Sequence, residues 1–244
     1  MVTKQKIVSL IDLTQLGNND TQQDIINLCK KARNSLGEVA AICVYKQFVP
    51  VVKEQLGNDF RVATVVNFPK GDSTVEDVVS EVNQALSLGA DEIDLVIDYK
   101  EYLDKGYSDK SCQIMKEIKN LCKDKVLKVI IESGELKSSS LIAKVCQDVI
   151  DSGADFIKTS TGKSSVGATI EAAQVMLNAI KNSDRKVGFK ASGGIRTYSQ
   201  AVEYLKLAEN ILSADFVTPH TFRFGVSGLL DNLINDKEED KGGY

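Results

Sequence analysis

The chain has a single histidine, His220, and an odd number of cysteines, five in 244 residues. A lone histidine with no cysteine or histidine at ligand spacing argues against a transition-metal site and against a Ser-His-Asp triad. The cysteines lie among apolar or helical neighbours without paired spacing, at positions 29, 43, 112, 122 and 146. We therefore expect reduced thiols rather than disulfides, and no metal site.

Basic charge and long apolar runs are also scarce. The net charge of -4 and the pI near 5.2 leave no basic excess for a nucleic acid backbone. Residues 1–6 lack the apolar region of a signal peptide, and the longest apolar runs, such as residues 39–45, are too short to span a bilayer. We expect neither a nucleic acid nor a membrane partner, and we predict a cytoplasmic protein.

Short apolar runs rich in β-branched residues alternate with segments of helical periodicity, and no Pro- or Ser-rich linker divides them. Strands are expected at residues 8–14, 39–45, 61–68, 92–98, 127–133, 156–161, 186–192 and 216–219. The clearest helices are expected at 75–88, 112–122, 141–150, 170–180 and 201–212. A βα repeat of about 30 residues with continuously apolar strands is typical of a (β/α)8 barrel. We predict a single-domain α/β TIM barrel over residues 1–236, with an open doubly wound sheet as the alternative.

The last eight residues, 237–244, differ from the rest in composition. They are mostly charged and glycine-rich, and they end in Tyr244. Such a segment cannot bury enough apolar surface to order itself. We predict a mobile C-terminal tail.

Two lysines interrupt apolar strand patterns and are each followed by a glycine-rich turn. Lys158 lies in the expected sixth strand and Lys190 in the seventh, which are neighbours in a barrel. Burial and a second ammonium nearby both lower the pKa of a lysine, which activates it for attack on a carbonyl. The alternative for each lysine is a side chain that only extends out of a strand end into solvent.

Asp94 is the third candidate. Strand alternation places it with Glu92 and Asp98 on one face, so it points inward only if the even positions face the barrel interior. There it could transfer protons during Schiff-base chemistry, or it could simply pair with a buried lysine. Asp12 and Lys128 are similar polar residues in apolar strands and would extend this network, or be merely structural.

Three late glycine-rich turns are candidates for phosphate binding, because barrels often hold phosphate in the loops after the last strands. They cover residues 161–165, 193–197 and 224–228. Glycines let backbone N–H groups approach an anion, and a helix N-terminus adds favourable partial charge. A phosphorylated small molecule is therefore the expected substrate.

Seven motifs follow one another along nearly the whole chain, at residues 12–14, 40–45, 65–69, 89–94, 128–136, 156–162 and 188–196. In these motifs, with this order and spacing, the chain resembles deoxyribose-phosphate aldolase. The resemblance implies a cofactor-free class I aldolase of deoxyribonucleotide catabolism, which splits 2-deoxy-D-ribose 5-phosphate into acetaldehyde and glyceraldehyde 3-phosphate. A homodimer is a candidate assembly.

The resemblance also implies roles for individual residues. Lys158 would form the Schiff base, Lys190 would lower its pKa, and Asp94 would transfer protons. Asp12, Lys128, Thr161 and Tyr244 would support them, and phosphate would be bound by Gly162, Lys163, Gly193, Gly194, Arg196, Gly225 and Ser227. Two alternatives stay open: another class I or transaldolase-like aldolase acting on a phosphorylated sugar, and a non-catalytic barrel that binds a sugar phosphate.

Two departures from the pattern accompany this resemblance. Residues 190–194 read Lys-Ala-Ser-Gly-Gly, where many members have Lys-Pro-Ala-Gly-Gly. Gly228 occupies a position where some members carry a second serine, so one hydroxyl contact to phosphate is missing.

Overall fold

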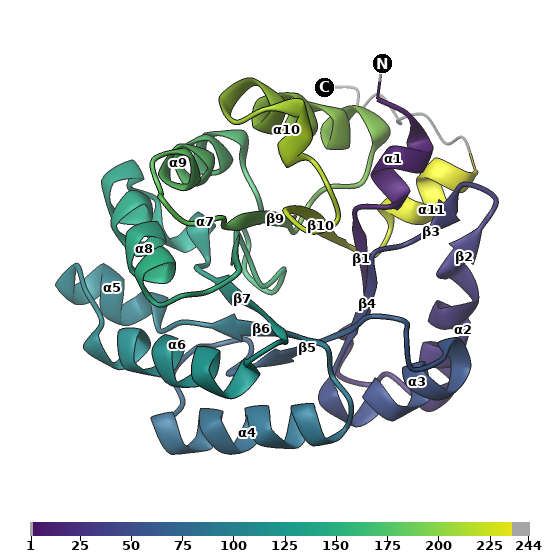
Figure 1. Ribbon diagram of the computed structural model, residues 1–244, viewed down its shortest axis with the longest axis horizontal. Helices are drawn as coiled ribbons and strands as arrows, with labels where there is room; N and C mark the ends of the chain where they lie inside the picture. Colours follow the sequence, from purple (N-terminus) through teal and green to yellow (C-terminus); the bar gives the residue numbers. More distant parts are fainter. Residues whose placement is uncertain (1, 236–244) are drawn as a thin grey trace.

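The computed structural model describes residues 2–235 and contains a closed barrel of parallel strands (Figure 1). Around the barrel the strand order is β1-β10-β9-β8-β7-β6-β5-β4. The strands are β1 (Ile11–Thr14), β4 (Ala41–Val44), β5 (Val62–Val66), β6 (Glu92–Val96), β7 (Val126–Ile130), β8 (Phe156–Lys158), β9 (Gly188–Ser192) and β10 (Phe222–Val226). The predicted TIM barrel is therefore confirmed. A separate antiparallel pair, β2 (Arg33–Asn34) and β3 (Gly37–Glu38), lies outside it.

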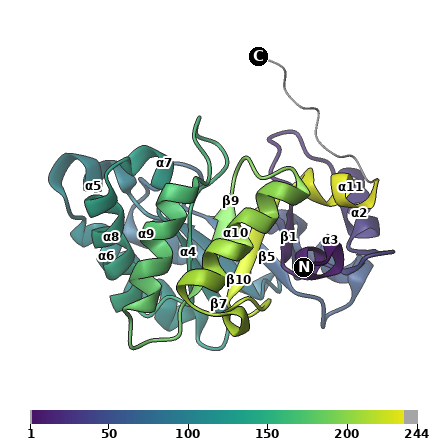
Figure 2. The same ribbon diagram turned by 90° about the horizontal axis from the view of Figure 1, so that it is seen from above.

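Helices surround the barrel, as the two perpendicular views show (Figures 1 and 2). They are α1 (Lys4–Val8), α2 (Gln22–Lys31), α3 (Val49–Leu56), α4 (Val75–Ser87), α5 (Tyr99–Lys105), α6 (Asp109–Cys122), α7 (Ser133–Leu136), α8 (Ser139–Asp151), α9 (Ile170–Lys181), α10 (Tyr198–Ile211) and α11 (Leu229–Ile234), with the 3-10 turns η1 (Lys46–Phe48) and η2 (Ala214–Phe216). Many begin at a serine or threonine whose hydroxyl accepts from a first-turn N–H, as at Thr21, Thr74, Ser108, Ser138, Thr169 and Thr197. The five predicted helices are confirmed, with ends that shift by three residues or fewer.

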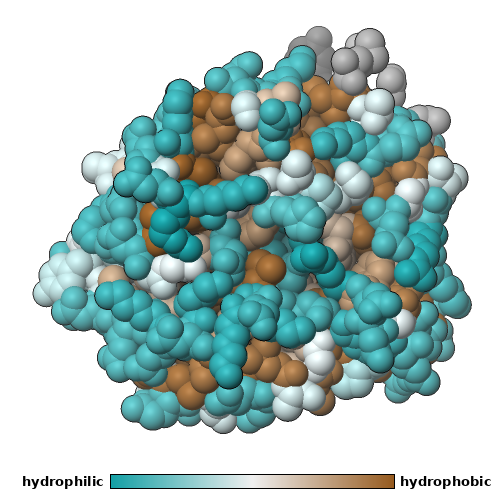
Figure 3. Space-filling model, in the orientation of Figure 1, coloured by the Kyte–Doolittle hydropathy of each residue, from teal (hydrophilic) through white to brown (hydrophobic). Residues whose placement is uncertain are grey.

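The main hydrophobic core lies between the strands and this outer layer of helices. Ile93 and Leu95 of β6 pack into that core, whereas Asp94 between them faces the barrel interior and pairs there with lysines. The predicted strand parity, with even positions inward, is thus confirmed for Asp94. Outside, the face seen in the orientation of Figure 1 is largely hydrophilic, with hydrophobic side chains interspersed (Figure 3). No helix within residues 2–235 is long and apolar enough to cross a membrane.

Four expected strands differ from the structure by three residues or more at one end or both. The fifth ends at Ile130 and not at residue 133, and the sixth ends at Lys158 and not at residue 161. The first begins at Ile11 and not at residue 8, because α1 occupies residues 4–8. The last is not at 216–219: η2 ends at Phe216, and the strand is β10 at Phe222–Val226. The inward Arg223 interrupts the apolar pattern of this strand, and residues 224–226, expected in a loop, belong to β10. The predicted tail, residues 237–244, lies outside the described residues.

Candidate active site

A cavity of about 800 Å³ opens at the C-terminal ends of the strands. Its wall combines the ends of β1, β8, β9 and β10 with the turns that follow them. The lining residues that matter below are Lys158, Thr161, Gly162, Lys163, Ser192, Gly193, Gly194, Arg196, Gly225, Ser227 and Gly228. Every predicted phosphate-binding residue therefore lies on one cavity, together with one of the two predicted lysines.

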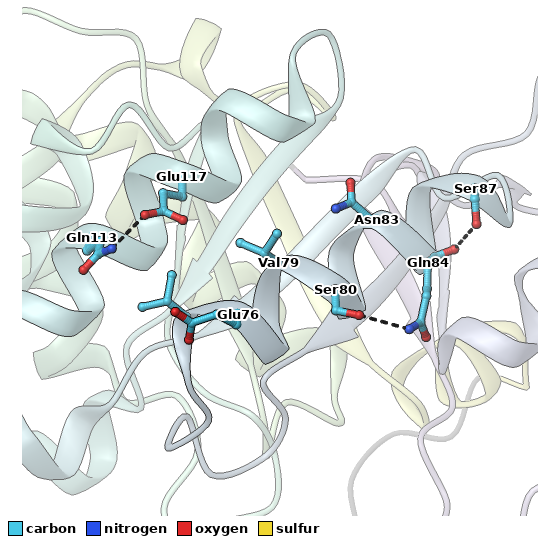
Figure 4. Close-up of a pocket in the computed structure, with 9 residues that line it drawn as sticks. Glu76, Val79, Ser80, Asn83, Gln84, Ser87, Gln113 and Glu117 are labelled. Atoms are coloured by element: carbon cyan, nitrogen blue, oxygen red, sulfur yellow. Dashed lines mark hydrogen bonds between the residues drawn. The ribbon is translucent and has the colours of Figure 1, made fainter.

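A second hollow, of about 710 Å³, lies on the outside of the barrel between α4 and α6 (Figure 4). Its polar side chains bond mainly along their own helices, as Gln113 does with Glu117 at 2.8 Å and Gln84 with Ser80 at 3.3 Å. No lysine or arginine of the described part of the chain lines it. It offers no group that could act on a carbonyl or neutralise a phosphate, so the cavity at the barrel mouth is the candidate site.

Lys158 connects the cavity to a buried ion network in which Asp94 joins the two predicted lysines. Lys158 Nζ and Lys190 Nζ each donate to Oδ2 of Asp94 at 2.7 Å. The two lysines are opposite each other in the β8–β9 ladder, so their side chains leave neighbouring strands at the same height. Of these three residues only Lys158 lines the cavity, and it is 3% exposed. The alternative of lysines extending into solvent is wrong for both.

Asp12 and Lys128 extend the network below this layer, as predicted from their place in apolar strands. Lys190 Nζ donates to Asp12 Oδ2 at 2.5 Å. Lys128 Nζ donates to Asp94 Oδ1 at 2.8 Å and lies 2.5 Å from Glu92 Oε2. All of these side chains are fully buried, so their charges are compensated by one another.

Two members of the network were missed by sequence reasoning. Arg223 of β10 pairs with Asp12 and, at 3.0 Å, with Glu92. Glu92 shares the parity of Asp94 on β6, which was a usable signal. The sequence does not indicate an inward position for Arg223, because the residues after it have the pattern of a glycine-rich turn.

The electrostatics separate Lys158 from the other buried lysines. Burial lowers the pKa of Lys158; Asp94 opposes this shift and the Lys190 ammonium adds to it, for a net lowering. For Lys190 the effect of burial is outweighed by Asp12 and Asp94, which raise its pKa. Burial alone would raise the pKa of Asp94, but Lys128, Lys158 and Lys190 hold it well below its usual range. The site therefore contains an ionised carboxylate beside one amine that releases its proton more readily than an ordinary lysine.

The three glycine-rich turns form the upper wall of the cavity. Gly193 and Gly194 follow β9 with φ of 85° and 86°, a conformation open to glycine but costly for other residues. Within residues 2–235 the backbone N–H groups of Gly162, Gly193 and Gly194 donate to no protein acceptor. Unpaired N–H groups on a concave surface are suited to an anion. Lys163 is held over the mouth, where its Nζ donates to the carbonyl of Leu16 at 2.7 Å.

Thr161 belongs to a second polar cluster, which sequence reasoning did not identify. Its hydroxyl donates to Glu132 at 2.5 Å, and Ser164 donates to the same carboxylate at 3.0 Å. Thr161 lines the cavity and bonds to Glu132, and it takes no part in the lysine network.

Tyr244 lies outside the described residues. Five cysteines are free, and only Cys112 is half-buried rather than buried. No group of three metal-ligating His, Cys, Asp or Glu side chains occurs among residues 2–235.

The closed parallel barrel, with a buried cluster of lysines and carboxylates under a glycine-rich mouth, defines an α/β-barrel protein with one candidate active site at the C-terminal ends of its strands. A sequence model of the DeoC/LacD family of aldolases matches residues 6–230, nearly the whole chain. The chain belongs to this family and is an aldolase. The resemblance inferred from the motifs is thereby confirmed.

Solved structures agree with this assignment. A protein from Coccidioides immitis, provisionally named deoxyribose-phosphate aldolase, is 30% identical with a TM-score of 0.84 over 96% of this chain and 87% of its own. Deoxyribose phosphate aldolase from Aeropyrum pernix, described as a unique tetramer, is 25% identical with a TM-score of 0.78 over 96% and 92% of the two chains. A protein from Toxoplasma gondii ME49 with the same provisional name, 23% identical, shares the fold with a TM-score of 0.85 over 97% and 95%.

Proposed function

We propose that this aldolase is a class I enzyme that reversibly cleaves 2-deoxy-D-ribose 5-phosphate to acetaldehyde and D-glyceraldehyde 3-phosphate through a Schiff base on Lys158. The observation that carries the proposal is the environment of Lys158. Among residues 2–235 it is the one buried lysine that reaches the cavity, and burial together with Lys190 lowers its pKa. A neutral amine is the form that attacks an aldehyde.

The proposed reaction begins when Lys158 Nζ adds to the C1 aldehyde of the open-chain sugar, and loss of water gives an iminium. The iminium accepts the electron pair of the C2–C3 bond as that bond breaks, while the C3 hydroxyl loses its proton and becomes the aldehyde of glyceraldehyde 3-phosphate. Protonation of the remaining enamine at C2 and addition of water release acetaldehyde and regenerate the amine. No step requires a metal or an organic cofactor.

Asp94 is the proposed carrier of these protons. Its carboxylate is ionised and lies 2.7 Å from Lys158 Nζ, within the reach required of a general base. Lys190 is proposed to lower the pKa of Lys158. Asp12 and Lys128 are proposed to compensate the charges of the network around these two lysines. A separate cluster of buried apolar side chains is formed by Leu16, Cys43, Ala63 and Val65.

The phosphate is proposed to bind at the glycine-rich turns. The free N–H groups of Gly162, Gly193 and Gly194 and the ammonium of Lys163 support this assignment. Arg196, Gly225 and Ser227 line the same part of the cavity. Lys158 and these turns line the same cavity, so one substrate could reach both with its aldehyde and its phosphate.

Reductive trapping tests the proposal. Sodium borohydride added with acetaldehyde should leave an N-ethyl group on Lys158, found by peptide mass spectrometry, and Lys158→Met should remove it. Lys144→Met, on the exposed face of α8, is the matched control and should trap normally. An adduct on a different lysine would overturn the assignment of the nucleophile.

Product analysis tests the substrate. Incubation with 2-deoxyribose 5-phosphate should release glyceraldehyde 3-phosphate, measured with a coupled dehydrogenase, and a chelator should leave the rate unchanged. If acetaldehyde is refused as the donor in the reverse direction while a longer donor is accepted, the enzyme acts on another sugar phosphate. The homodimer stays a prediction, which light scattering of the purified protein can check.

A further inference from the structure

Glu132 is a buried carboxylate that the proposed chemistry does not use. It follows β7 by two residues, is 1% exposed, and adopts φ 51° and ψ 55° in the left-handed region. Residues with a side chain seldom adopt this conformation unless their surroundings enforce it. Glu132 forms no ion pair with any lysine or arginine within residues 2–235. A buried carboxylate without a cation has to be stabilised by hydrogen-bond donors.

Among the described residues, all the side-chain donors to Glu132 come from the segment that follows β8. The Thr161 hydroxyl donates at 2.5 Å, the Ser164 hydroxyl at 3.0 Å, and the backbone N–H of Thr161 lies 3.3 Å from both carboxylate oxygens. Thr161 begins this segment three residues after Lys158. One carboxylate therefore fixes the path of the chain directly beyond the proposed nucleophile.

The hydrogen bonds also determine which way the Thr161 hydroxyl points. Its oxygen accepts from the backbone N–H of Lys163 at 3.0 Å, so its own proton is directed to Glu132. The neighbouring turn adds a steric restraint, because a Cβ at Gly134 would lie 2.4 Å from the carbonyl oxygen of Val166. Residues 161–166 are thus held closely against the end of β7.

We propose that Glu132 is a positioning residue for phosphate recognition: by accepting three hydrogen bonds from Thr161 and Ser164, it holds the turn at Gly162 and Lys163 in the shape that binds the substrate phosphate. Gly162 and Lys163 both line the cavity, and the N–H of Gly162 is free to donate. The identity of the phosphorylated substrate rests on the proposed function. Glu132 itself lies behind this wall and does not line the cavity.

The direction in which the KM changes when Glu132 is replaced distinguishes a positioning role from the electrostatic effect of its charge. A negative charge near the phosphate would weaken anion binding, so its removal alone would lower the KM. Glu132→Gln also replaces one acceptor oxygen with an amide donor, which faces the donors of Thr161 or Ser164. Because those hydrogen bonds maintain the turn, we expect the KM to rise instead.

The experiment compares Glu132→Gln with Glu135→Gln, a matched change three residues along on α7. For Glu132→Gln, the KM for 2-deoxyribose 5-phosphate should rise roughly tenfold with kcat changed less than about twofold, while kcat/KM for unphosphorylated 2-deoxyribose stays constant. Glu135→Gln should leave all three values unchanged. An unchanged or lower KM in Glu132→Gln, or equal losses on both substrates, would overturn the proposal.

A milder variant and a direct binding measurement keep the test independent of folding and of the reaction. Ser164→Ala removes only one of the donors and should raise the KM by a smaller factor in the same direction. Calorimetric titration with inorganic phosphate should show weaker binding to both variants than to the wild type. If both variants bind phosphate more weakly than the wild type but 2-deoxyribose 5-phosphate is not cleaved, the proposed function fails and the role of Glu132 stands. If cleavage occurs and binding is equal in all three proteins, the role of Glu132 is wrong.

Discussion

Lys158 and Lys190 share one hydrogen-bond acceptor, Oδ2 of Asp94, which lies 2.7 Å from each nitrogen. Two ammonium groups held this close repel each other. The repulsion lowers most the pKa of the lysine that has fewer carboxylate partners. Lys190 also bonds to Asp12 at 2.5 Å, whereas Asp94 is the only carboxylate paired with Lys158 among the described residues. The arrangement therefore stabilises the charge on Lys190 at the expense of Lys158.

A count of the buried charges leads to the same residue. The carboxylates of Asp12, Glu92 and Asp94 are matched against four cations, Lys128, Lys158, Lys190 and Arg223. A buried cluster with one extra positive charge is neutralised when one amine loses its proton. Among these cations Lys158 is the one whose pKa is lowered, while the pKa values of Lys128, Lys190 and Arg223 are raised.

Replacing Lys190 with methionine should move the acidic limb of the pH–rate profile. Lys158 acts as the neutral amine, so the rate falls as the pH drops through its pKa. Without the Lys190 ammonium that pKa rises, and Asp94 is left to pair with Lys158 more strongly. We expect the fall in kcat/KM to begin at higher pH than in the wild type. Lys190→Arg retains the charge as a control, and an acidic limb that stays in place in Lys190→Met would contradict the role assigned to Lys190.

Asp94→Asn should separate Schiff-base formation from turnover. Asp94 raises the pKa of Lys158, so its removal favours the neutral amine, and borohydride trapping should persist. Proton transfer loses its carrier, and kcat should fall by about 10²- to 10⁴-fold. Asp91→Asn breaks comparable ion pairs, with Lys53 and Lys125, just before the same strand, and should leave kcat unchanged. Loss of trapping in folded Asp94→Asn protein would show that the carboxylate is needed earlier, for the attack itself.

Arg223→Met should destabilise the fold strongly. It removes the guanidinium that pairs with both Asp12 and Glu92 and leaves these buried carboxylates to Lys190, Lys128 and the partly exposed Arg61. Removing one partner of a buried ion pair costs about 3–5 kcal/mol in the free energy of unfolding. Urea denaturation at neutral pH would measure it, and Lys105→Met, which breaks an exposed pair with Glu101, should leave the free energy of unfolding nearly unchanged.

The loss caused by Arg223→Met should depend on pH. Burial disfavours the charged forms of Asp12 and Glu92, but their cationic neighbours lower both pKa values in the folded state. The stability that these carboxylates contribute is present above their unfolded pKa values and is lost on acidification. The difference between wild type and Arg223→Met should therefore shrink below about pH 4, near the unfolded values. A difference that is constant with pH would show that packing, not charge, is the cause.

The inward charged residues could be predicted where a single charge interrupts a long apolar run. Asp94, Lys158 and Lys190 lie in such runs, and the period of two in a strand then gives the face on which each side chain lies. Arg223 could not be found in this way, because it lies in a short strand that also contains Gly225 and follows Pro219. The sequence pattern there matches a loop as well as a strand.

The contacts of the network depend on strand register, which local patterns do not determine. Lys158 lies opposite Lys190, and Lys190 opposite Arg223, only because β8, β9 and β10 pair in one particular register.

Glu132 was missed for a related reason. Its donors come from 29 and 32 residues further along the chain, so no local motif indicates that it is paired.

Gly228 offers a way to strengthen phosphate binding. It lines the cavity beside Ser227, and a Cβ built on it would meet no atom within 4 Å. Its φ of -92° is open to any residue, so a side chain can be added without backbone strain. Gly228→Ser restores the hydroxyl found at this position in some members of the family. Because a hydrogen bond to a charged group is stronger than a neutral one, we expect the KM for 2-deoxyribose 5-phosphate to fall by roughly five- to tenfold.

Gly228→Ala is the matched control, since it adds the Cβ without the hydroxyl. Its KM should equal that of the wild type, and neither variant should change kcat/KM for unphosphorylated 2-deoxyribose. Gly228 also precedes α11 at the N-cap position, where a serine can accept from a backbone N–H instead of donating to phosphate. A higher melting temperature in Gly228→Ser with an unchanged KM would show that the hydroxyl caps the helix, and would contradict the predicted contact. A lower KM in the serine variant alone would locate the phosphate beside α11.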